Sequence, residues 1–312
     1  MIDYLVNKKI YLILLVIFSF SLSACDSNYF TGTGEGGITG TQGIKMEFIP
    51  GTVPQRIVEG ESYKFLLRIE NKGAVDIENG YLDFSSSTLN IENQNDFREF
   101  QLRGGDNAFR GEDKIFELQV KADDLRMQDV DQISTNIKIN ACYEYSTRFE
   151  GTMCIDSNPG YDSANKPCSI HPVSGGSGQG APVVVSRVLP MDTMGTVFDV
   201  YIRNARSGTV LSPGVSERVC REEFTTEDFG IIDIVEIRIS RYKLSEGQIN
   251  CESHTDRLNQ FDLTHRRDYI TCRITEDIPQ NQGTFTTPLT IELEYGYLET
   301  LEQRLSVTSR LR

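Results

Sequence analysis

The sequence predicts an all-β protein made of two antiparallel β-sandwich domains in tandem. Three observations support this fold class: apolar and polar residues alternate in one run after another, two glycine-rich segments divide the chain, and no long stretch has a 3.6-residue period. Alternation with one apolar side is typical of antiparallel strands that place one face on a core and the other in water.

The first 24 residues have the pattern of a lipoprotein signal peptide. Lys8 and Lys9 give a positive start, residues 10–22 are mostly apolar, and the small residues Ser23 and Ala24 precede Cys25. We expect cleavage before Cys25 and lipidation of that residue, which anchors the chain on the extracytoplasmic face of a bacterial or archaeal cell membrane. The alternative is an uncleaved anchor, although residues 10–24 are shorter than the about 20 apolar residues that span a bilayer.

Two flexible segments set the expected domain boundaries. Residues 25–43 contain the Gly/Thr-rich stretch TGTGEGGITGTQG and should act as a tether, and residues 173–181 are a Gly/Ser linker. We therefore expect one sandwich over residues 44–172 and a second over residues 182–312. The match of residues 32–37 to a GxGxxG pattern carries no weight, because no strand precedes it and no helix follows it.

Individual strands follow from their alternation. Tyr63, Phe65, Leu67 and Ile69 share one face of a strand in the first domain, and Phe116, Leu118 and Val120 share one face of another. In the second domain the apolar faces are predicted to be Phe198, Val200, Ile202 on one strand and Val235, Ile237, Ile239 on a later one. On the former strand Asp199, Tyr201 and Arg203 form the polar face.

The two domains also look like copies of one another. The strand from Tyr63 to Asn71, followed by Gly73, parallels residues 196–204, which end at Asn204 and are followed by Gly208. Further on, the Tyr143-x-Tyr145 strand parallels Tyr295-x-Tyr297. Twelve residues separate Tyr143 from Ile155 and Tyr295 from Val307, which predicts a final hairpin in each domain.

These residues resemble the Ig-like, CARDB-type modules of bacterial and archaeal surface proteins. The resemblance rests on residues 58–61 (Val-Glu-Gly-Glu), residues 67–73 (Leu-Arg-Ile-Glu-Asn-Lys-Gly) and the Tyr-x-Tyr strand near each domain's end. It implies two Ig-like sandwiches that act as spacers, adhesive units or binding platforms, with no catalytic residues. The cysteine content departs from such modules.

Cysteine content indicates an oxidising compartment. Without Cys25, six cysteines remain: Cys142, Cys154, Cys168, Cys220, Cys251 and Cys272. An even number in an exported protein favours disulfides, and there is no CxxC pair to suggest zinc. A Cys142–Cys154 or a Cys154–Cys168 bond is compatible with the sequence, and Cys251–Cys272 is the favoured pair. Because each domain holds three cysteines, either one bridge crosses between the domains or two thiols stay free.

Chemically active residues are sparse. His171, His254 and His265 are the three histidines, none has HExxH spacing, and the absence of tryptophan disfavours a carbohydrate hydrolase. Asp156, Asn158 and Asp162 place oxygen donors at alternate positions as a calcium loop would, although Asx turns explain the same residues. Apart from this calcium hypothesis we expect no cofactor and no enzymatic activity.

The net charge of the chain limits the classes of partner that it can bind. A net charge of −14, from 45 acidic and 31 basic residues, disfavours nucleic acid as a partner. The sequence thus predicts a membrane-anchored, non-enzymatic adhesion, scaffold or protein-binding module of the cell envelope, which contacts its partner through strand edges and loops. The alternative is a ligand-binding or accessory lipoprotein of a transporter or secretion machine, and an envelope hydrolase is a third reading.

Overall fold

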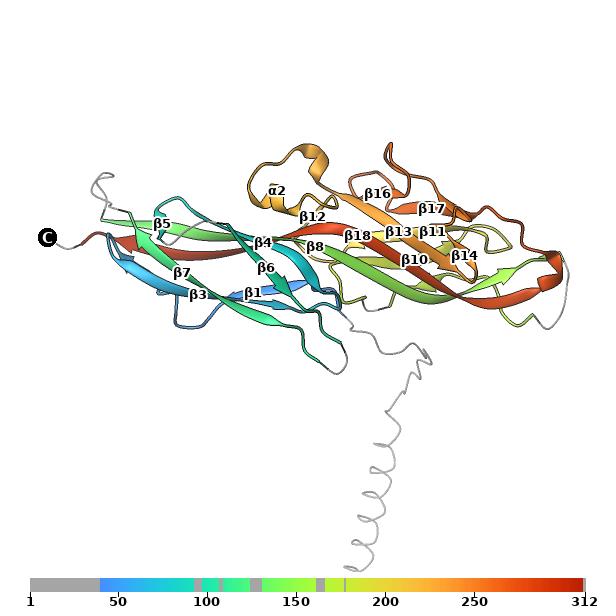
Figure 1. Cartoon of the computed structure of the whole chain (residues 1–312), viewed down its shortest axis with the longest axis horizontal. Helices are drawn as coiled ribbons and strands as arrows, with labels where there is room; N and C mark the ends of the chain where they lie inside the picture. The colour runs from blue at the N-terminus through green and yellow to red at the C-terminus, as the bar shows by residue number, and fades with distance from the viewer. Residues whose placement is uncertain are drawn as a thin grey trace, which may run out of the picture. The chain divides into compact units, whose positions relative to one another are not determined.

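A computed structural model describes residues 40–92, 97–106, 109–123, 131–160, 166–176 and 178–310. The predicted fold class is confirmed, because these residues form antiparallel sheets with only short helices (Figure 1). The predictions for the signal peptide, for Cys25 and for the tether before residue 40 lie outside the described residues.

The strands of the described residues form three sheets. The N-terminal sheet has the order β1-β3-β7-β5, formed by β1 (Ile44–Phe48), β3 (Ser62–Asn71), β7 (Asp113–Ala122) and β5 (Leu89–Glu92). The C-terminal sheet has the order β15-β17-β11-β10-β9, formed by β15 (Ile249–Cys251), β17 (Tyr269–Ile274), β11 (Val197–Asn204), β10 (Val183–Pro190) and β9 (Val173–Ser174).

The central sheet is shared by both sandwiches and has the order β14-β13-β18-β8-β4-β6. Its strands are β14 (Tyr242–Lys243), β13 (Ile231–Ile239), β18 (Thr284–Thr308), β8 (Gln132–Asp156), β4 (Ile77–Ser86) and β6 (Phe97–Leu102). β12 (Thr209–Leu211) and β2 (Arg56–Val58) pair with β18, and β16 (Gln260–Asp262) pairs with β13. The helical turns are α2 (Ser216–Cys220), η2 (Thr226–Asp228) and η3 (Gln280–Gln282).

β8 and β18 are the two longest strands, with 25 residues each. They pair antiparallel without interruption from Gln132↔Thr308 to Asp156↔Thr284. The prediction of a final hairpin in each domain is therefore wrong: each candidate hairpin is one continuous strand. Alternation explains this, because Tyr145, Thr147 and Phe149 continue the buried face of β8 with no turn between them.

The chain does not divide at residues 173–181. Val173 and Ser174 form β9 and pair with β10, and Gln179 exchanges side-chain hydrogen bonds with the backbone of Val185. The carbonyl oxygen of Gly180 accepts a 3.0 Å hydrogen bond from Ala74 N–H. Residues after the N-terminal segment form one compact unit, so the two sandwiches share β8 and β18 and are not joined by a free linker.

Apolar side chains fill both sandwiches. Between the N-terminal and central sheets the core includes Phe65, Leu67, Leu118, Ile139 and Val307, and between the C-terminal and central sheets it includes Phe198, Val200, Ile270, Ile237 and Ile291. One residue of a predicted apolar face is wrong: Val235 is 38% exposed, whereas Ile237 and Ile239 of the same predicted face are buried. A β-bulge between Ile234 and Glu236 reverses the alternation there.

Candidate binding surface

Four buried tyrosines lie where the two copies of the internal repeat meet. Tyr143 pairs with Tyr297 and Tyr145 with Tyr295 in the β8–β18 register, and all four are at most 4% exposed. Ring centroids are 5.9 Å apart in the first pair and 6.3 Å in the second. We call these four residues the tyrosine hub. Antiparallel pairing of the two Tyr-x-Tyr copies gives the central sheet a local two-fold relation.

Each hub tyrosine also fixes a neighbouring segment. The hydroxyl of Tyr143 accepts a hydrogen bond from Ile44 N–H of β1, at 3.4 Å, and that of Tyr295 accepts one from Val183 N–H of β10, at 3.3 Å. Tyr145 donates to the Gly180 carbonyl and Tyr297 to Asn204 Oδ1, each at 3.0 Å. The hub thereby connects the central sheet to β1 of the N-terminal sheet and to β10 and β11 of the C-terminal sheet.

The repeated Asn-to-Gly turns have a packing reason. A Cβ atom on Gly73 would collide with the Tyr145 hydroxyl, and one on Gly208 would lie 2.5 Å from the Tyr297 ring. Both turns therefore need glycine where a hub tyrosine reaches the backbone.

One position breaks the repeat. Thr147, which follows Tyr145 on the buried face of β8, donates a 2.6 Å hydrogen bond to the Val183 carbonyl. The corresponding residue of β18 is Glu299. Among the described residues, its carboxyl has no hydrogen-bond or ion-pair partner. It lines a cavity of about 290 Å³ together with Lys45 of β1 and Arg206. Burial raises the pKa of Glu299 to about 7, and the charge of Arg206 opposes the rise.

This burial predicts a pH-dependent stability. Because the folded chain holds the Glu299 proton more tightly than the unfolded chain, its stabilising effect is complete below pH 4.5 and is lost as the pH rises through about 7. We expect Glu299→Gln to raise the free energy of unfolding by about 1–3 kcal/mol at pH 8 and to change it little at pH 4.5. Denaturant unfolding at both pH values measures this. Glu302→Gln, on the same strand but exposed, is the control, and an equal gain from Glu299→Gln at both pH values would contradict the assignment.

Six cysteines form three disulfides in the described chain. Cys154–Cys168 closes a short loop, and Cys251–Cys272 joins directly paired residues of β15 and β17, with Cα atoms 4.0 Å apart. Cys142–Cys220 connects β8 to α2 across a sequence separation of 78 residues. The sequence left two alternatives open, a bridge between the two predicted domains or two free thiols. The structure has the bridge, which is Cys142–Cys220.

The segment bearing Cys220 was not anticipated from the sequence. α2 packs on the outer face of the central sheet, where Leu211, Val219 and Cys142 form a small second core. The two carboxylate oxygens of Glu144 on β8 accept hydrogen bonds from Gly214 N–H and Ser216 N–H, at 3.0 and 3.1 Å. A five-residue helix has too few turns for its periodicity to show in the sequence.

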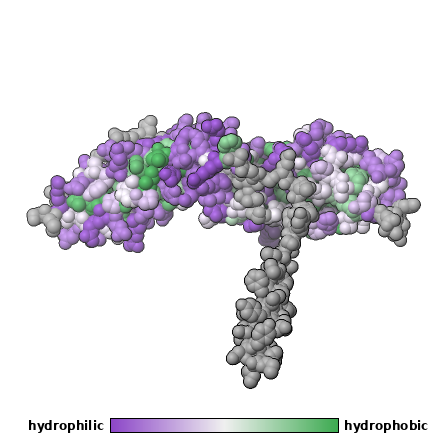
Figure 2. Space-filling view, turned by 90° about the horizontal axis from the view of Figure 1, so that it is seen from below, coloured by the Kyte–Doolittle hydropathy of each residue, from purple (hydrophilic) through white to green (hydrophobic). Residues whose placement is uncertain are grey.

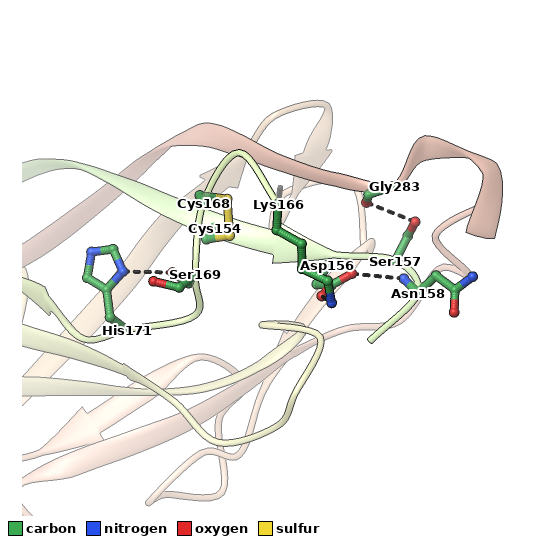
Figure 3. Close-up of a disulfide and its surroundings, with 9 residues drawn as sticks. All are labelled: Cys154, Asp156, Ser157, Asn158, Lys166, Cys168, Ser169, His171 and Gly283. Atoms are coloured by element: carbon green, nitrogen blue, oxygen red, sulfur yellow. Dashed lines mark hydrogen bonds and ion pairs between the residues drawn. A yellow bond between two sulfur atoms is a disulfide. The ribbon is translucent and has the colours of Figure 1, made fainter. Parts of the chain in front are cut away.

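The candidate calcium residues are only partly described. Figure 3 shows Asp156 beside the Cys154–Cys168 bridge, with Lys166 reaching its carboxylate. Lys166 Nζ lies 2.6 Å from Asp156 Oδ2, and Asn158 N–H donates to Oδ1 at 3.1 Å in an Asx turn. The Lys166 bond lowers the pKa of Asp156. Asp162 lies outside the described residues, so the calcium hypothesis stays untested.

His171 lies apart from the other two histidines, which contact each other. His171 Nδ1 is 2.7 Å from the Ser169 carbonyl oxygen, as Figure 3 shows. His254 and His265 stack at 4.2 Å, and burial together with the nearby His265 lowers the pKa of His254. Within the described residues no group of three or more His, Cys, Asp or Glu side chains is arranged to hold a metal ion.

A cationic and aromatic row crosses the outer face of the C-terminal sheet. Arg187 of β10 pairs with Tyr201 of β11, which pairs in turn with Tyr269 of β17. The Arg187 guanidinium carbon is 3.9 Å from the Tyr201 ring centroid, and the two tyrosine rings are 5.1 Å apart. Arg267 lies 5.9 Å from the Tyr269 ring, and the exposed Arg203 follows Tyr201 on the same face. We call these five residues the arginine–tyrosine face.

Sequence analysis identified part of this surface. It placed Tyr201 and Arg203 on the polar side of one strand, which the burial pattern of β11 supports. It did not assign Arg187 or Tyr269 to the same surface. Alternation predicts on which face of its strand a residue lies, but it does not predict which strands are neighbours in the sheet.

Most of the remaining surface is polar. Figure 2 shows one side of the chain as largely hydrophilic, with hydrophobic residues confined to small separate patches. Among the described residues the large exposed apolar side chains are dispersed along the sequence: Phe109, Ile115, Met191, Phe224, Val235 and Leu258.

Comparisons with known proteins give matches among solved structures. No family model and no curated protein matches the chain. Among solved structures it is similar to serine-rich repeat adhesion glycoprotein Srr1 of Streptococcus agalactiae, with 8% identity, a TM-score of 0.17 and coverage of 86% of this chain and 97% of that one. Serine-rich repeat protein Srr2 of the same species has 10% identity and a TM-score of 0.16, with coverage of 84% of this chain and 91% of that one. The collagen adhesin CNA of S. aureus has 11% identity and a TM-score of 0.11, with coverage of 87% of this chain and 93% of that one. In the described part of the chain, no helix has the length and apolar character to cross a bilayer.

Proposed function

We propose that this chain is an exported, non-enzymatic binding module, held at the cell envelope by a lipid on Cys25 and contacting its partner through the arginine–tyrosine face. The observation that carries the proposal is the gathering of three exposed arginines around two tyrosines whose rings are in contact, on an otherwise acidic chain. Arginine and tyrosine are enriched among the residues that dominate binding energy at protein surfaces.

The architecture supports a presenting role for this face. Arg187, Tyr201 and Tyr269 stand on three adjacent hydrogen-bonded strands, whose other side packs on the apolar core. A surface on a rigid sheet holds its side chains at fixed spacing and loses little entropy on binding. The tyrosine hub fixes β10, the strand that bears Arg187, to the central sheet.

Site-specific photo-cross-linking in the producing cells tests this function. The full chain would carry a photoreactive residue either at Ser174, which pairs with Arg187, or at Arg238, which is exposed on the outer side of the central sheet. We expect an adduct from position 174 and none, or a much weaker one, from position 238. Equal adducts from both, or adducts from position 238 alone, would contradict the proposed face. Attachment to a transporter or secretion component would favour the accessory-lipoprotein alternative.

A further inference from the structure

Three arginines without an ion pair lie together on the arginine–tyrosine face. Within the described residues Arg238 and Arg304 also make no ion pair, so the feature that distinguishes the face is the grouping of its arginines around two tyrosines. Among the described residues, no carboxylate lies within ion-pair distance of Arg187, Arg203 or Arg267, whereas Arg148 is within 3.0 Å of both Glu150 and Glu292. A chain with 45 acidic residues has many carboxylates for pairing. Leaving three neighbouring guanidinium groups unpaired costs Coulomb repulsion that an anionic partner would relieve.

Contacts with tyrosine rings order two of these guanidinium groups, those of Arg187 and Arg267, before any partner arrives. Arg187 lies over the ring of Tyr201, and the Tyr201–Tyr269 contact extends that support towards Arg267. A guanidinium stacked through its flat side keeps its N–H edge free for two parallel hydrogen bonds to one carboxylate, sulfate or phosphate group. Neighbouring strands lie about 4.8 Å apart, so the arginines can contact successive anionic groups of an extended molecule.

The face offers hydrogen-bond donors and very few acceptors. Guanidinium groups have no acceptor, and the backbone groups of β11 are used by β10 on one side and β17 on the other. Asp199, the carboxylate of the same side of β11, accepts a 2.6 Å hydrogen bond from Thr271 and is 3% exposed. An added peptide strand brings a row of N–H donors, for which the five residues of the face offer only the two tyrosine hydroxyls as acceptors. A polysaccharide with anionic groups presents mainly acceptor oxygens.

We propose that the arginine–tyrosine face binds an anionic polysaccharide, one that bears sulfate, carboxylate or phosphate groups. This inference rests on the proposed function and specifies the partner. Arg187, Arg203 and Arg267 contact successive anionic groups, and the exposed edges of Tyr201 and Tyr269 contact the sugar rings between them. The net negative charge of the chain disfavours polyanions elsewhere on its surface, so binding is confined to this face.

Binding to dextran sulfate and to uncharged dextran, which share a backbone, tests the inference. The full mature chain, extracted in neutral detergent, would be titrated at low salt and at 0.3 M salt. We expect binding to dextran sulfate that weakens as salt rises, and no binding to dextran. Arg187→Ala, Arg203→Ala and Arg267→Ala should each weaken binding about 3- to 10-fold, and Tyr201→Ser should weaken it by releasing Arg187.

Arg238→Ala and Arg304→Ala are matched controls, since both arginines are exposed on strands of the central sheet. An unchanged melting temperature confirms that each variant is folded. The inference is overturned if the controls lose as much affinity as the face variants, if dextran binds equally, or if poly-glutamate or phosphatidylserine vesicles bind more tightly than dextran sulfate. Loss of the cross-link from position 174 in the face variants, without any dextran sulfate binding, would refute the polysaccharide and leave the proposed face standing. If the face variants kept both the cross-link from position 174 and any binding to dextran sulfate, the proposed face and the polysaccharide would both be refuted.

Discussion

Tyr295→Ala is expected to lower the free energy of unfolding by about 3–5 kcal/mol, the usual cost of truncating a buried aromatic side chain. Tyr295 is fully buried, packs against two other hub tyrosines, and accepts a hydrogen bond from Val183 N–H. Because its ring neighbours Tyr145 and Tyr297 lie on β8 and β18, the strands that both sandwiches share, the loss should reach strands on both sides of the hub. Denaturant unfolding measures the change, and hydrogen exchange locates it in β3 as well as in β11.

Two further variants serve as comparisons. One separates the contribution of the Tyr295 ring from that of its hydroxyl, and the other measures the loss of a tyrosine outside the hub. Tyr295→Phe keeps the ring but leaves the Val183 N–H without its partner, so we expect a loss of about 1–3 kcal/mol. Tyr269→Ala removes a partly buried tyrosine of the outer face and should cost about 1 kcal/mol or less. If Tyr295→Ala lowered protection only in β11, the hub would not connect the two sandwiches.

Removal of the Cys142–Cys220 bridge is the second large effect. A cross-link over 78 residues restricts the unfolded chain more than one over 14 residues, which separates Cys154 from Cys168. In the chain-entropy description, loops of these lengths correspond to about 4.5 and about 3 kcal/mol. We expect the double variant Cys142→Ala/Cys220→Ala to lose more stability than Cys154→Ala/Cys168→Ala.

Equilibrium unfolding of both double variants under non-reducing conditions checks this order. The Cys154–Cys168 pair is the internal control, because it also joins β8 to a later segment but closes a short loop. A smaller loss for the Cys142–Cys220 pair would show that α2 is held by Glu144 and its apolar neighbours, without a major contribution from the bridge.

Alternation in the sequence predicted the antiparallel β class and most of the strand faces. Phe65, Leu67, Phe198 and Val200 are buried as expected. Alternation failed at Val235, where a bulge adds one residue and turns the side chain outward. Internal similarity drew attention to the two Tyr-x-Tyr segments, but it did not reveal that they pair with each other.

The domain boundary could not be predicted for a related reason. Glycine and serine at residues 173–181 are typical of a free linker, yet here small residues allow close backbone contact: the Gly180 carbonyl receives hydrogen bonds from both Tyr145 and Ala74. Local composition cannot distinguish these cases, since the contacts come from residues far away in the sequence. The arginine–tyrosine face was hidden in the same way, because it depends on the register of three strands.

Differential scanning calorimetry of the full mature chain tests most directly whether the two sandwiches form one cooperative unit through β8, β18 and the tyrosine hub. The shared strands predict a single transition with a van't Hoff enthalpy equal to the calorimetric enthalpy. Two separable transitions, with β3 losing hydrogen-exchange protection at a lower temperature than β11, would contradict the account.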